Sequence, residues 1–163
     1  MGNNTPATTA AADFALRLHT ERDALKAFVT LLETEQQALI DGHTEQLFAL
    51  ADSKVLATQE LSNLATARSD KLLAHGAKVE PGNMTAWLQA NAKDSLPVWH
   101  DIQQLAEQSQ QLNRTNGVLI QTKLRNNQQA LMALQNAAHG TTGLYGPDGQ
   151  PNLPASGRTL GSV

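Results

Sequence analysis

The chain of 163 residues contains no cysteine, and aromatic residues make up only 4% of it. The lack of cysteine excludes disulfides, cysteine-containing zinc sites and thiol catalysis. Because aromatic residues are so few, the core must be aliphatic, mainly leucine and alanine, as in helical bundles. The net charge of −3 and the pI near 5.9 provide no large positive field, so neither nucleic acid nor an anionic membrane is an expected partner.

Long apolar runs are also missing. The first residues lack the basic start and the apolar stretch of a signal peptide, and no run is long enough to span a bilayer. Pro6 interrupts the myristoylation pattern that Gly2 begins. We therefore expect a soluble, cytoplasmic protein without membrane insertion.

Catalytic and metal-binding motifs are absent as well. None of the five histidines follows an Asp or Glu by three residues, and no two histidines are four residues apart. The patterns of helical di-iron and zinc sites are therefore missing. Neither a Gly-rich phosphate loop nor a Gly-x-Ser-x-Gly elbow occurs. We expect no catalytic residue, no metal and no cofactor.

The apolar residues recur at helical spacing. The first predicted helix, from about Asp13 to Ile40, carries four leucines spaced seven residues apart: Leu18, Leu25, Leu32 and Leu39. Gly42 predicts a short turn at residues 41–43. A turn this short predicts an antiparallel hairpin with a second helix over residues 45–74, which Thr44 can cap.

The second and third long helices have predicted inner sides of their own. For the second helix we expect burial of Leu47, Leu50, Ala57, Leu61, Leu64 and Leu72. A short helix at residues 84–91, with Trp87 and Leu88, precedes a third long helix that Asp94 or Ser95 can cap. The predicted inner side of this third helix is Leu96, Trp99, Ile102, Leu105, Leu112, Leu119, Ile120, Leu124, Leu131 and Leu134.

The third helix is predicted to be the longest. If it runs to Ala138, it measures about 60 Å, against about 40–45 Å for the first two helices. It must therefore either extend beyond the bundle or bend near Gly117, where glycine weakens a helix. We expect both tryptophans, Trp87 and Trp99, to pack against the bundle.

The predicted organisation has three parts: a disordered leader at residues 1–12, a helical bundle domain at 13–139, and a flexible Gly/Pro-rich tail at 140–163. The tail holds six of the eleven glycines and three of the six prolines, so it cannot bury enough apolar surface to offset its ordering entropy. Its Leu144 and Tyr145 suggest a segment that orders on a partner. The expected fold is all-α: an antiparallel bundle of three long helices, a short extra helix between the second and third, and this tail.

One stretch of the chain has an unusual composition. No acidic residue occurs between Glu107 and Asp148, and the only cations there are Arg114, Lys123 and Arg125. Amides form hydrogen bonds without the desolvation cost of a charge. On composition alone, a weakly charged solvated face explains this stretch slightly better, but its combination with the apolar tail favours binding. The amides expected on this surface are Gln108, Gln110, Gln111, Asn113, Asn116, Gln121, Asn126, Asn127, Gln128, Gln129, Gln135 and Asn136.

The same stretch carries a family resemblance. The run Asn116-Gly-Val-Leu-Ile-Gln-Thr-Lys-Leu-Arg-Asn-Asn-Gln-Gln-Ala-Leu-Met-Ala-Leu-Gln135, followed by Leu144-Tyr-Gly-Pro-Asp-Gly149, resembles the C-terminal part of FlgN flagellar secretion chaperones. The order of a helical hairpin, a tryptophan-bearing turn, a long helix and a Tyr-Gly tail is also similar. The resemblance covers about residues 13 to 150, and the tail motif is its most specific part.

The resemblance implies a non-catalytic, cytoplasmic type III export chaperone. Such chaperones bind the C-terminal helices of the hook-associated proteins FlgK and FlgL and bring them to the flagellar export gate. Carried over to this chain, it implies an export-gate contact at Leu144 and Tyr145. The implied cargo-binding residues are Leu119, Ile120, Leu124, Asn127, Leu131 and Leu134.

Other interpretations stay open from the sequence. A place in the bundle core explains Leu119, Leu124 and Leu131 equally well when each is taken singly. The main alternative function is a self-assembling helical-bundle adaptor with no export role. A helical enzyme or metal carrier ranks below both.

Overall fold

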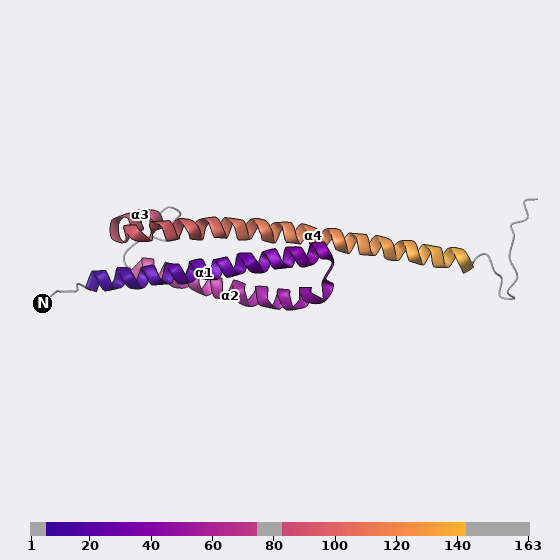
Figure 1. Ribbon diagram of the computed structural model, residues 1–163, viewed down its shortest axis with the longest axis horizontal. Coiled ribbons are helices and arrows are strands. Elements are labelled where there is room, and N and C mark those ends of the chain that lie inside the picture. The colour runs from indigo at the N-terminus through magenta and orange to yellow at the C-terminus, as the bar shows by residue number, and fades with distance from the viewer. Residues whose placement is uncertain (1–5, 75–82, 143–163) are drawn as a thin grey trace, which may run out of the picture. The chain divides into compact units, whose positions relative to one another are not determined.

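The computed structural model describes residues 6–74 and 83–142, and the side chains of 12–74 and 83–138; regular structure in these ranges is entirely helical. The helices are α1 (Pro6–Asp41), α2 (Thr44–Ala74), α3 (Asn83–Asn91) and α4 (Leu96–Thr142), with a short 3-10 helix at Lys93–Ser95 before α4 (Figure 1). The predicted all-α fold is confirmed. The chain divides into two compact units, residues 1–120 and 121–163.

The first helix begins earlier than predicted. It starts at Pro6 rather than at Asp13. Proline suits the first turn, where its missing N–H has no helical partner, and the alanines that follow favour a helix. The predicted disordered leader is therefore wrong for residues 6–12, and residues 1–5 lie outside the described ranges.

The predicted turn after α1 is confirmed. Gly42 has a φ of +81°, the left-handed conformation that glycine adopts without a steric cost. The backbone N–H groups of Gly42 and His43 both donate to the Ala38 carbonyl oxygen at 3.0 Å, which satisfies the end of the helix. The next helix begins at Thr44, one residue before the predicted start, and ends at Ala74, as predicted.

Ion pairs fix the direction of α2 relative to α1. Lys71 Nζ lies 3.0 Å from Asp13 Oδ2, and Lys54 Nζ lies 2.8 Å from Glu35 Oε2. Asp13, near the start of α1, thus pairs with a residue near the end of α2, and Glu35, near the end of α1, pairs with a residue in the first half of α2. The two helices therefore run in opposite directions. The hydrogen bond from Lys71, and a second one from Arg17, hold the pKa of the Asp13 carboxyl below its ordinary value.

The core of the first unit is aliphatic, as the composition predicts, and all four leucines of the seven-residue ladder in α1 are buried. Of the residues predicted to be buried in α2, only Leu72 is; the others are half-buried, because α2 packs chiefly against α1. The central cluster draws on four helices: Phe14, Leu18, Leu25, Leu72, Met84, Leu88, Val98 and Ile102.

Both tryptophans pack against the helices, as predicted. The rings of Trp87 in α3 and Phe14 in α1 are tilted by 59°, with centroids 4.8 Å apart. The guanidinium carbon of Arg68, in α2, lies 5.0 Å from the ring centroid of Trp99 in α4. These contacts attach the short helix and the start of α4 to the hairpin.

The last helix is continuous. α4 passes through Gly117 without a break and ends at Thr142, beyond the predicted end at Ala138. Residues 140–142, predicted as the start of the tail, are therefore helical. The loop at 75–82 and the tail at 143–163, with Leu144 and Tyr145, lie outside the described ranges.

Candidate functional site

The C-terminal part of α4 carries exposed apolar side chains. Leu124 and Leu131 are each 58% exposed, and Leu134 is 69% exposed. Ile120 and Asn127 are also exposed, whereas Leu119 is half-buried. The residues that we predicted on the inner side of this helix are therefore exposed at four positions: Ile120, Leu124, Leu131 and Leu134.

Five of the six predicted cargo-binding residues share one face of α4. They recur at alternating spacings of four and three residues, and at about 100° per residue they fall within about 80° of one another. This is the heptad seam by which one helix packs along another. We call this set the α4 stripe: Ile120, Leu124, Asn127, Leu131 and Leu134. Leu119 lies about 100° away from Ile120 and is outside it.

The surroundings of the α4 stripe are weakly basic. The described residues from 108 to 138 include no acid, and Lys123 and Arg125 are the cations nearest to the stripe in sequence. The remaining polar neighbours are mainly Asn and Gln, which donate and accept hydrogen bonds at a small desolvation cost. The face therefore suits an apolar helix from another protein, with amides at its edges.

Asn116 has a role that sequence reasoning missed. We expected it among the surface amides, but it is completely buried. Its Nδ2 donates hydrogen bonds to the Leu32 carbonyl oxygen and to Glu35 Oε2, both at 2.8 Å. The signal was its spacing, four residues after Leu112 and three before Leu119, both of which are half-buried.

The buried amide belongs to a polar cluster that joins three helices. Lys54 Nζ donates to Glu35 Oε1 at 3.1 Å and to Glu35 Oε2 at 2.8 Å. The Glu35 carboxylate in α1 thus accepts hydrogen bonds from Lys54 in α2 and from Asn116 in α4. We call Glu35, Lys54 and Asn116 the Glu35 cluster; it holds α4 beside the hairpin just before the α4 stripe begins.

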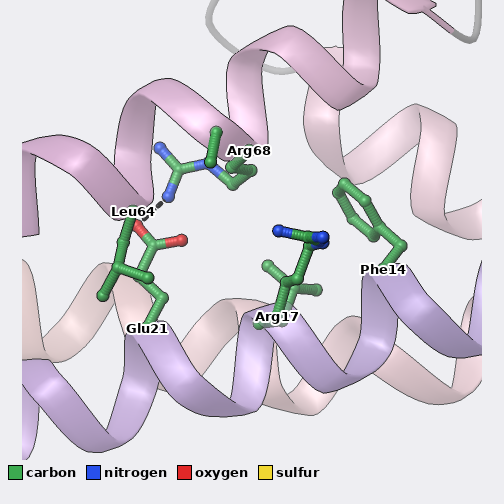
Figure 2. Close-up of a pocket in the computed structure, with 7 residues that line it drawn as sticks. Phe14, Arg17, Glu21, Leu64 and Arg68 are labelled. Carbon is green, nitrogen blue, oxygen red and sulfur yellow. Dashed lines mark hydrogen bonds and ion pairs between the residues drawn. The ribbon is translucent and has the colours of Figure 1, made fainter.

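A second ion pair joins α1 and α2, nearer the N-terminal end of α1. Figure 2 shows Arg68 reaching from α2 to Glu21 on α1, with Arg17 and Phe14 nearer the N-terminal end of α1. Glu21 is buried, and Arg68 also contacts the ring of Trp99. Glu21 and Arg68 line a small pocket between α1 and α2, and their ion pair holds these two helices together.

The described ranges hold neither a metal site nor a membrane span. Within 6–74 and 83–142, no three His, Asp or Glu side chains come close enough to hold a metal ion. No helix there is both long and apolar enough to cross a membrane. Among the described residues, the α4 stripe is an exposed apolar face on a helix, so fold and site define an all-helical protein with an apolar helix face at its surface.

Comparison with known families identifies this class more closely. The family model described as FlgN protein matches residues 10–152, most of the chain. The chain belongs to the FlgN family, a family of helical-bundle chaperones for flagellar export, and the resemblance seen in the sequence is confirmed. No curated protein and no solved structure shows significant similarity to it.

Proposed function

We propose that this protein is a cytoplasmic chaperone that binds the C-terminal helices of FlgK and FlgL and delivers them to the flagellar export gate. Membership of the FlgN family supports an export-chaperone role in general. The observation that carries the finer proposal is the α4 stripe, because four exposed aliphatic residues at heptad spacing are a costly surface unless a partner covers them.

The proposed mechanism is reversible helix packing, with no bond made or broken. A cargo helix that would otherwise pair with other subunits lays its apolar side along the α4 stripe. Each aliphatic side chain covered contributes about 1.5–3 kcal/mol, while association costs roughly 4–15 kcal/mol in lost freedom. With four such side chains the two terms are comparable, which favours a complex that can release its cargo.

The proposed bundle arrangement supports this mechanism. We infer an antiparallel bundle of three long helices in which α2 runs opposite to both α1 and α4. The ion pairs between α1 and α2 and the hydrogen bonds from Asn116 to Leu32 and Glu35 support this arrangement. A bundle tied by these contacts gives the cargo-binding helix a rigid base.

The test of the proposed function is a calorimetric titration. The full chain is titrated with C-terminal helical segments of FlgK and of FlgL, and we expect saturable binding with one segment per chaperone. An unrelated amphipathic helix of equal length and charge is the control. No heat and no co-elution with either segment, together with stable self-association, would instead favour the self-assembling adaptor.

The proposed gate contact makes a separate prediction for the tail. Replacing Tyr145 by Ala should leave the affinity for cargo segments unchanged and reduce secretion of FlgK and FlgL, because Tyr145 lies outside the α4 stripe. Leu144→Ala is the companion variant. Secretion at the wild-type level with both variants would exclude this role for the tail.

A further inference from the structure

A second exposed apolar surface lies on α2. Phe48 is 84% exposed, Val55 69% and Leu56 72%. Phe48 and Val55 are seven residues apart and share one face, and Ala57 lies about 180° from Phe48, on the side that turns toward α1. We call Phe48, Val55 and Leu56 the α2 patch. Large apolar side chains exposed close together on one helix are typical of an interaction surface, and the α4 stripe does not account for these three.

A groove runs beside the α2 patch. Val55 is part of its lining, and the rest of the lining is Glu35, Ala51, Lys54, Thr58, Gln59 and Ser62. Small and amide side chains along a helix allow another helix to approach closely. The patch and groove together therefore fit a helix, with Phe48 as the largest anchor.

The charges around the α2 patch are acidic. Between residues 44 and 67, α2 carries the exposed acids Glu45, Asp52 and Glu60, and its only cation is Lys54. Lys54 is already bonded to both carboxylate oxygens of Glu35. A matching partner helix should therefore be apolar on one side, carry cations and lack acids.

The chain itself contains such a helix. The α4 stripe is apolar, Lys123 lies beside it at about 60° from Ile120, and the described residues 108–138 contain no acid. We propose that the α2 patch binds the α4 stripe of a second copy of this chain. Two copies then exchange two identical contacts, as in a twofold symmetric dimer.

This dimer would cover the α4 stripe when no cargo is present. That consequence rests on the proposed function, since cargo and the second copy would compete for the same stripe. The dimer contact itself is argued from charge and exposure alone. Phe48→Asp should therefore weaken dimerisation and leave cargo binding intact, whereas Leu124→Asp should weaken both.

Sedimentation velocity of the full chain tests the proposal. Over about 1 to 200 µM in low salt, a range that brackets weak dimers, we expect a concentration-dependent dimer that high salt weakens. Phe48→Asp should weaken dimerisation at least tenfold. Leu16→Asp, at a 67% exposed leucine of α1, is the matched control and should dimerise like the wild type.

Charge reversal gives a test that misfolding cannot imitate. Asp52→Lys and Lys123→Glu should each weaken the dimer, and an equal mixture of the two variants should restore it, because each α2 patch then meets a stripe of opposite charge. A wild-type chain that stays monomeric throughout, or a dimer indifferent to both Phe48→Asp and the charge reversals, would overturn the proposal. A wild-type chain that is monomeric but still binds FlgK would overturn only the dimer proposal. A chain that dimerises but binds neither FlgK nor FlgL would overturn only the proposed function.

Discussion

Replacing Leu124 by Asp weakens binding of a FlgK or FlgL C-terminal helix by at least about tenfold, and Leu131→Asp does the same. Covering one leucine contributes about 1.5–3 kcal/mol, and each 1.4 kcal/mol corresponds to a tenfold change in affinity. The introduced carboxylate adds a desolvation cost if the partner still covers it. Calorimetric titration with the cargo segment measures the change.

The fold should survive these substitutions, because Leu124 and Leu131 are both more than half exposed. The matched control is Gln129→Asp, which adds the same charge to the same helix at about 160° from Asn127 in the stripe, after a step of two residues. Circular dichroism should be unchanged in all three variants. Wild-type affinity in Leu124→Asp and Leu131→Asp would contradict the assignment, and so would a helical signal lost only in these two.

Replacing Lys54 by Met lowers the free energy of unfolding by about 3 kcal/mol, because it leaves the buried Glu35 carboxylate without its cation. Glu35 is buried, and only the Asn116 amide would still donate to it. Urea unfolding followed by circular dichroism measures the loss. Lys26→Met, at an exposed lysine of α1, is the control and should change stability by less than about 0.5 kcal/mol.

A combined variant separates the polar cluster from general sensitivity of this region. Glu35→Met, Lys54→Met and Asn116→Leu together remove both charges and the amide, whose Oδ1 is buried without a partner among the described residues. Apolar replacement of a whole buried ionic cluster is often neutral or stabilising. We therefore expect the free energy of unfolding of this variant to lie within about 1 kcal/mol of the wild-type value. A triple variant less stable than Lys54→Met alone would refute this account of the cluster.

Helical periodicity predicted the fold well. The ladder of leucines in α1 identified its buried side correctly, since all four leucines are buried and two of them, Leu18 and Leu25, belong to the central cluster. Gly42 fixed the turn, because few other residues adopt a positive φ. The start of α1 was misplaced, since Pro6 was interpreted as part of a disordered leader when proline also suits a helix start.

Periodicity was less informative about burial. It correctly placed Leu124, Leu131 and Leu134 on one face, but a repeat cannot tell whether another helix covers that face.

Polar residues in apolar positions were the other source of error. Asn116 was grouped with the surface amides by its type, although its spacing from Leu112 and Leu119 indicated the core. Glu35 is buried for the same reason, three residues after Leu32 and four before Leu39. A buried Glu needs a cation from elsewhere in the chain, and the sequence does not show which lysine supplies it.

In the proposed function, this chain acts by binding a client helix along the α4 stripe. Hydrogen–deuterium exchange of the full chain, with and without a FlgK C-terminal segment, tests it most directly. We predict slower exchange across residues 120–134 in the complex, with the buried part of α1 around Leu32 unchanged. Binding that leaves 120–134 unprotected, or that protects only other parts of the chain, would contradict it.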